Sequence, residues 1–217
     1  MPQSTDNKFG DEIALLHKLL QAGERIGVPR ELWDNLANNT DLLQQVMRFT
    51  SPQLSPATYK IETDYEQSAH EALSNGKLVV DPGILDHQFE VSGSNRHQFG
   101  VRLASFYRRR FRETTTMLTR LGYRHLNILE LIAFASIYNT HLFAQTIVAG
   151  GSVNRGPDAN LLVSIKKADE GAQARWMVGV EKFKVGHVVP DDLMFAVVET
   201  AGMPWHIENH RTINLRE

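Results

Sequence analysis

The sequence predicts an α+β fold, in which an N-terminal helical bundle precedes a mixed, mainly antiparallel sheet domain with packed helices. Apolar residues recur at helical spacing through the first fifty positions, and alternating runs typical of strands begin at Thr58. Residues 121–153 then combine a capped helix with a β-rich run. We therefore expect a helical cap at 1–50, a linker at 51–57, the α+β domain at 58–200 and a tail at 201–217.

The first fifty residues predict three short helices. Residues 11–26 place their leucines on one face, and Gly27 ends that helix. Pro29 suits the first position of a second helix, which carries Leu32, Trp33 and Leu36, and residues 41–49 repeat the pattern. Short helices joined by tight turns favour a small bundle.

The segment 51–56 contains two prolines and two serines, which makes it the best linker candidate. Beyond it, alternating or apolar runs predict strands at 58–65, 78–80, 99–106, 161–165, 174–183 and 193–199. Helical spacing predicts helices at 68–73 and 114–121, and residues 154–160 are expected to form a long loop. Short connections between several strands indicate antiparallel pairing.

Residues 121–153 carry the clearest local signals. Asn127 stands three residues before Glu130, which is the spacing of a capping box at a helix start. The residues after Asn127 are apolar at helical spacing, and the run Thr146-Ile147-Val148 then predicts a strand that ends at Gly150-Gly151. The stretch predicts a helix packed on a sheet.

The chain of 217 residues contains no cysteine, which excludes disulfides, zinc–thiolate and iron–sulfur sites and a cysteine nucleophile. The first twelve residues are polar and do not resemble a signal peptide. The longest apolar run, residues 128–138, is interrupted by Glu130 and is too short to span a bilayer. We therefore expect a soluble, cytoplasmic protein.

Charge is unevenly distributed along the chain. The net charge is −2, yet residues 102–125 hold seven arginines against the single acid Glu113. Four of these arginines, interleaved with aromatic rings, could bind the phosphates of a nucleic acid or another polyanion: Arg108, Arg109, Arg110 and Arg112. The favoured interpretation is a solvated connection between a strand and a helix, whose arginines pair with the acidic N-terminal bundle.

Two histidine groups could bind a metal ion. His206 and His210 would lie one turn apart on a helix, although an ordinary polar tail is the favoured interpretation. His187 with Asp191 and Asp192 could form a metal site or an acid–base pair, or simply a turn.

The order of features from 58 to 199 resembles a family of uncharacterised bacterial proteins. The likeness lies in TYKIETDYEQSAHEAL, a strand ending FYR, LGYRHLNILELIAF, TIVAGGSV and a closing FAVVE. The chain lacks the Pro-Ala-Thr of the family pattern and ends Val-Val-Glu where the pattern has Val-Arg. The resemblance implies no activity, because the family has none assigned.

A more distant likeness is to C-type-lectin-like and formylglycine-generating-enzyme-like domains, in which a helix packs under a small sheet. That likeness implies a scaffold that displays a ligand on long loops. The oxidase chemistry of one branch would not carry over, because it requires cysteines.

The sequence shows no converging catalytic set and no cofactor motif, which favours a non-catalytic binding or interaction protein whose ligand is a protein or a small molecule. Two alternatives stay open. One is nucleic-acid or polyanion binding through the arginine segment, and the other is a metal-dependent hydrolase built from distant histidines and aspartates.

Overall fold

The computed structural model describes residues 21, 29–41, 52–76, 78–138, 145–156, 159–168, 175–184, 186–200 and 210–214. The chain divides into two compact units, Met1–Thr50 and Ser51–Glu217.

The predicted N-terminal helical bundle is wrong for the residues that the structure describes. In the first unit, helix α2 (Arg30–Asn38) is the element with defined bounds, and Pro29 precedes it in an extended conformation. The predicted helices at 11–26 and 41–49 lie almost entirely outside the described residues. Leu32 of α2 remains 49% exposed. Its side chain is therefore not buried by helix packing, as a bundle would require.

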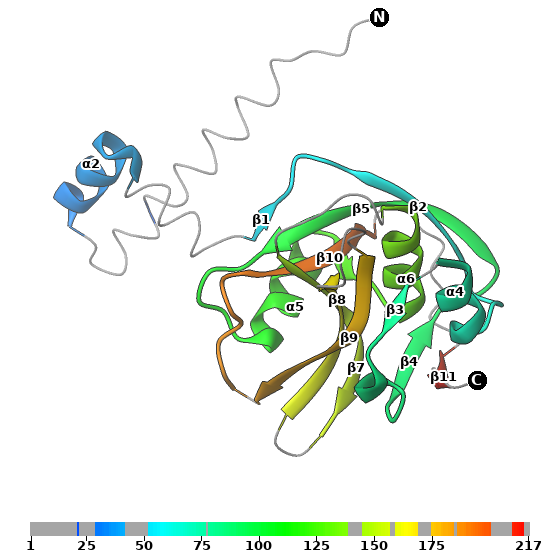
Figure 1. The fold of residues 1–217 in the computed structure, drawn as a ribbon. Coiled ribbons are helices and arrows are strands. Elements are labelled where there is room, and N and C mark those ends of the chain that lie inside the picture. The colour runs from blue at the N-terminus through cyan, green and yellow to red at the C-terminus, as the bar shows by residue number, and fades with distance from the viewer. Residues whose placement is uncertain are drawn as a thin grey trace, which may run out of the picture. The chain divides into compact units, whose positions relative to one another are not determined.

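The second unit is built on a mixed sheet of nine strands, which are coloured from cyan to orange in Figure 1. Its path runs β1-β5-β10-β7-β8-β9-β3, while β2 also pairs with β5 and β6 with β10. Most pairs are antiparallel, and β10–β7 and β3–β9 are parallel. The strands are β1 (Gln53–Leu54), β2 (Tyr59–Asp64), β3 (Val79–Val80), β5 (Arg96–Ser105), β6 (Tyr123–His125), β7 (Thr146–Arg155), β8 (Ala159–Ala168), β9 (Arg175–Lys184) and β10 (Leu193–Glu199).

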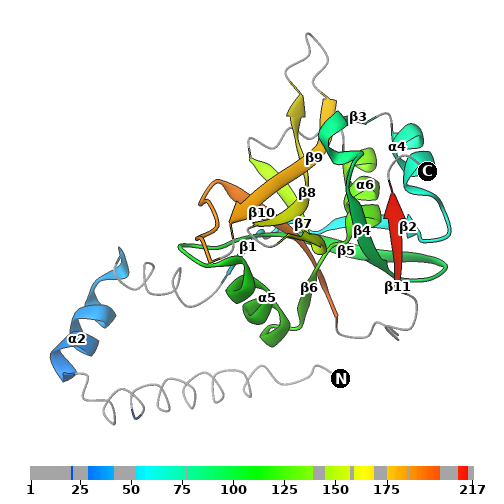
Figure 2. The same ribbon diagram turned by 90° about the horizontal axis from the view of Figure 1, so that it is seen from below.

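Helices cover both faces of this sheet (Figures 1 and 2). On one face, α4 (Ala69–Gly76) and α6 (Ile128–Ile137) pack over the larger apolar cluster, and α5 (Phe111–Arg120) packs over the smaller cluster on the other. Successive strand residues alternate between the clusters: Val197 belongs to the smaller and Val198 to the larger. The α+β content is compatible with the sequence prediction, and the sheet replaces the bundle as the dominant feature.

The predicted capping box is confirmed. The Glu130 amide donates to Asn127 Oδ1 at 3.1 Å, and the Asn127 amide donates to Glu130 Oε2 at 2.8 Å. Two N–H groups at the start of α6 are thereby satisfied.

The predicted end of a strand at the glycine pair is wrong, because β7 continues to Arg155. The register with β8 shifts between Ala149 and Val153. A Cβ at Gly150 would lie 2.7 Å from the His125 ring, and one at Gly151 would lie 2.7 Å from the Leu126 carbonyl oxygen. The glycines therefore allow close approach to the segment 125–126 rather than end the strand.

Four short strands were not predicted. The pair β4 (Gln88–Ser92) and β11 (His210–Asn214) forms a second, two-stranded sheet, with β11 inside the expected tail. The two-residue β1 lies in the expected linker and pairs with β5. The three-residue β6 pairs with β10. Such short segments carry too few residues to show a period.

None of the helices in the described part of the chain has the length and apolar character needed to cross a membrane.

Candidate anion-binding site

A cleft of about 910 Å³ lies beside α5, at the end of the sheet where the β7–β8 hairpin turns and β9 ends. Five arginine and lysine side chains line it: Arg110, Arg112, Arg120, Arg155 and Lys184. We call this the basic cleft. Its other lining residues are Phe111, Thr115, Thr116, Thr119, Asn160, Gly186 and His187.

The side chains that line the described part of the basic cleft are positively charged or neutral. Of the described residues that line it, none is aspartate or glutamate. Within the described residues, the ion pairs formed by arginine lie elsewhere, such as Arg96 with Asp64 at 2.9 Å and Arg124 with Glu130 at 2.7 Å. The protein therefore neutralises some of its arginines and leaves those of the cleft facing solvent.

Helix α5 arranges one wall of the basic cleft. Arg112, Thr116 and Arg120 follow at intervals of four residues and form a row along one side of the helix. At a rise of ~1.5 Å per residue, the two arginines are separated by roughly 12 Å along the axis. The buried residues Thr114 and Leu118 hold the opposite side of α5 against the sheet.

The strands supply the other wall. Arg155 and Asn160 face each other as register partners near the β7–β8 turn. Lys184 is the partner of Ala159 at the adjoining end of β9. The β7–β8 hairpin and the end of β9 thus place polar side chains at one end of the sheet.

A backbone contact joins the segments that precede α5 and follow β9. The Val189 amide donates to the Arg109 carbonyl oxygen at 2.7 Å, and Arg110 and Val188 form an antiparallel bridge. This contact fixes Arg110 on one segment relative to His187 on the other.

Phe111 lies in the cleft lining and is only partly buried. Its ring stacks on His125 at a centroid distance of 5.8 Å and on Phe195 at 6.1 Å. The ring therefore packs against aromatic rings of the core and remains partly exposed in the lining of the cleft.

His125 supports the same wall from within the protein. Burial, assisted by the charge of Arg124, lowers the pKa of His125 to about 3, so the imidazole is neutral at physiological pH. Its Nε2 lies 3.3 Å from the hydroxyl of Thr115, a lining residue. The neutral ring thus positions a hydroxyl at the edge of the cleft without adding charge.

The structure brings together part of the predicted arginine set. Arg110 and Arg112 line the basic cleft, whereas Arg108 and Arg109 do not. The Arg108 guanidinium lies over the Tyr107 ring at 5.3 Å. Of the other arginines in 102–125, Arg120 also lines the cleft.

Sequence reasoning missed Arg155, Asn160 and Lys184 as members of this site. No local motif marks them, because they lie together only through the pairing of β7 with β8 and of β8 with β9. Pairing of the predicted arginine set with the acidic N-terminal residues stays a prediction.

The predicted pair His206 and His210 stays a prediction, because only one of the two residues is described. His206 lies outside the described residues, and His210 begins strand β11. His187 lines the basic cleft, but Asp191 and Asp192 do not. Over the described ranges, no three histidine or carboxylate side chains are grouped to hold a metal ion. The metal-dependent hydrolase stays an untested hypothesis.

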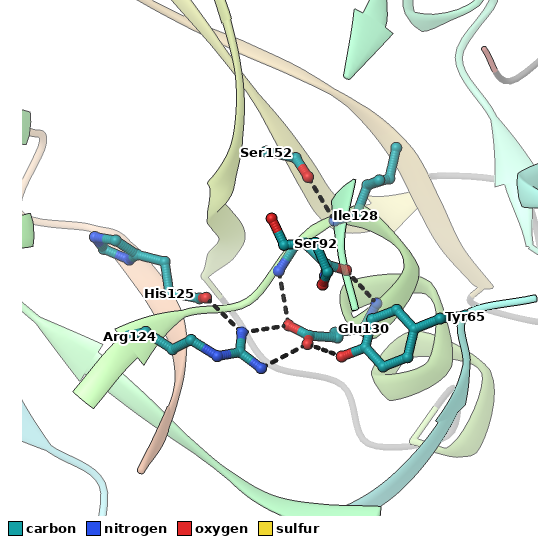
Figure 3. Close-up of polar contacts among 8 residues, drawn as sticks. Tyr65, Ser92, Arg124, His125, Ile128, Glu130 and Ser152 are labelled. Carbon is teal, nitrogen blue, oxygen red and sulfur yellow. Dashed lines mark hydrogen bonds and ion pairs between the residues drawn. The ribbon is translucent and has the colours of Figure 1, made fainter. Parts of the chain in front are cut away.

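A second polar cluster lies in the core around Glu130, which is fully buried (Figure 3). Its carboxylate accepts hydrogen bonds from Arg124, from the hydroxyl of Tyr65 and from the Asn127 amide. Burial, followed by the Glu130 charge, raises the pKa of Tyr65. Burial opposes the charge of Arg124, but Glu130 outweighs it and raises the pKa of Arg124. These groups satisfy one another, so the cluster serves the fold.

Comparisons of the chain with family models, curated proteins and solved structures gave no match. The resemblances to an uncharacterised bacterial family and to lectin-like domains therefore stay predictions.

Proposed function

We propose that this protein binds a polyanion through the basic cleft. The observation that carries the proposal is the set of five arginine and lysine side chains that line one cleft, with no carboxylate among its described lining residues. The proposal joins two hypotheses from the sequence, a binding protein and a polyanion ligand. The proposed site is not the segment 108–112 alone but a surface to which α5, β7, β8 and β9 all contribute residues.

Electrostatics supports this assignment. Cations of one sign gathered on a concave surface repel each other and concentrate a positive potential that attracts anions. A multivalent phosphate ligand would relieve that repulsion and release its own counterions on binding. The threonine hydroxyls and the Asn160 amide add donors that suit phosphate oxygens.

The test is a titration of fluorescein-labelled inorganic polyphosphate followed by anisotropy at several salt concentrations. We compare the wild type with the cleft variant R112Q/R155Q/K184Q. The matched control is R108Q/K167Q/K182Q, which removes the same charge from exposed positions outside the cleft lining.

We expect the cleft variant to bind at least about tenfold more weakly than the control, with a shallower dependence of log K on log salt. Equal losses in both variants would show that only net charge matters and would overturn the proposed site. Absence of binding, or affinity that ignores salt, would overturn the proposed function.

A further inference from the structure

We infer that the polyanion is a single-stranded nucleic acid, one base of which stacks on Phe111. This inference rests on the proposed function of the basic cleft and names the class of its ligand. The juxtaposition that carries it is an aromatic ring set between Arg110 and Arg112 in a cleft lined by cations.

The ring of Phe111 is prepared for stacking. It lies nearly parallel to the rings of His125 and Phe195, at interplanar angles of 30° and 20°. Those contacts support it from behind and restrict its rotation. An aromatic platform that is already ordered loses little side-chain entropy when a base stacks on it.

The cations are placed for a chain of phosphates. Arg110 and Arg112 flank the platform in sequence, and Arg120 ends the row on α5 roughly 12 Å beyond Arg112 along the helix axis. Cations spread over this length match successive phosphates of a strand better than one phosphate group. Thr116, between the two arginines of the row, offers a hydroxyl for phosphate or sugar oxygens.

The nucleic acid should be single-stranded, because stacking on the Phe111 ring requires a base whose face is accessible. In a duplex the base faces are covered by their neighbours, and exposing one costs several kcal/mol of unstacking and unpairing. A single strand presents its bases freely and can follow a groove that combines cations with a stacking ring. Sequence preference should be weak, because every base has a face that stacks.

The experiment measures four labelled probes by anisotropy: oligo(dT) of about twelve nucleotides, its duplex with oligo(dA), an abasic strand of equal length, and inorganic polyphosphate with the same number of phosphates. The variant is Phe111→Leu, which keeps apolar volume next to Phe195 and removes the ring. The matched control is Phe183→Leu, which alters another partly buried phenylalanine of the same cluster outside the cleft lining.

We expect Phe111→Leu to weaken oligo(dT) binding about tenfold, and to leave the abasic strand and polyphosphate unchanged. Phe183→Leu should change none of them. The wild type should bind the duplex more weakly than the single strand. A Phe111→Trp variant, which preserves a stacking ring, should show indole quenching on adding oligo(dT) beyond any seen in the wild type.

Equal effects of Phe111→Leu on oligo(dT) and polyphosphate, no quenching in Phe111→Trp, or equal affinity for duplex and single strand would each overturn this inference while leaving polyanion binding in place. Failure of all four probes to bind the wild type would instead overturn the proposed function. If Phe111→Leu fails to fold, the quenching of Phe111→Trp still decides the question.

Discussion

Arg124 and Glu130 form a two-point ion pair, with Nη1 2.8 Å from Oε2 and Nη2 2.7 Å from Oε1. The carboxylate is completely buried and also caps the start of α6 through the Asn127 amide. One acidic side chain thus joins strand β6, helix α6 and, through the Tyr65 hydroxyl, the segment that follows β2.

Arg124→Leu should strongly destabilise the second unit. It would leave the Glu130 carboxylate in the core without its cation, and breaking a buried pair in this way costs about 3–5 kcal/mol. Urea unfolding followed by circular dichroism measures the loss. The control is Arg96→Leu, which breaks an exposed pair with Asp64 and should have a much smaller effect. Similar losses in the two variants would contradict the role assigned to Glu130.

Stability should fall as pH is lowered from about 6.5 toward 3, because of His125. The pKa of this residue is about 3 in the folded protein against an ordinary value of 6.5. Between these pH values the unfolded chain binds more protons at this ring than the folded protein does. The free energy of unfolding therefore decreases by up to ~1.4 kcal/mol for each pH unit by which the pH is lowered. Above pH 6.5 both states are neutral at this ring and the contribution is complete.

The measurement is the free energy of unfolding as a function of pH for the wild type and for His125→Phe. The phenylalanine ring keeps the stacking with Phe111 and does not titrate. The variant should therefore lose stability less steeply below pH 6.5. An unchanged slope would show that His125 is accessible to protons in the folded state.

Gly151→Ala should destabilise the fold by roughly 1–3 kcal/mol, the usual cost of overpacking. Its Cβ would lie 2.7 Å from the Leu126 carbonyl oxygen, which also accepts the Gly151 amide at 2.8 Å. The atoms that the Cβ would meet belong to the backbone of His125 and Leu126, so no flexible side chain can move aside. Gly179→Ala is the control in another strand, since its Cβ would meet Asp81 at an ordinary 3.4 Å. Thermal unfolding of both variants should show a lower midpoint for Gly151→Ala alone.

The cleft variant R112Q/R155Q/K184Q should be more stable than the wild type at low salt. Removing three of five neighbouring cations relieves repulsion worth up to about 1 kcal/mol, which raises the melting temperature by ~2–4 °C in a domain of this size. At 1 M salt the difference should vanish, because the screening length falls to ~3 Å. A decrease in melting temperature that is independent of salt would mean that these side chains hold the fold.

Much of the second unit could be predicted from periodicity. The strands β2, β5, β8, β9 and β10 and the helices α4, α5 and α6 lie within a few residues of the predicted ranges. The capping pair Asn127 and Glu130 was visible because both halves of the motif lie three residues apart. The spacing of residues along the sequence is therefore enough to predict an element whose apolar or capping residues all lie within that element.

The remaining features depend on contacts between distant segments. Gly150 and Gly151 suggest a strand end until the ring of His125 and the backbone of Leu126 are seen beside them. The basic cleft needs Arg155 and Lys184, whose nearness to α5 follows only from the order of the sheet. The helical bundle was overpredicted because amphipathic spacing in α2 does not guarantee a packing partner, as the exposed Leu32 shows.

The place of β10 in the sheet has a consequence for how the chain is made. β10 lies between β5 and β7, yet it is the last of these three to leave the ribosome. Until it emerges, both neighbours present an open inner edge, the kind of surface that recruits strands from other nascent chains. We therefore expect truncated translation products that end before Leu193 to aggregate or to be held by chaperones.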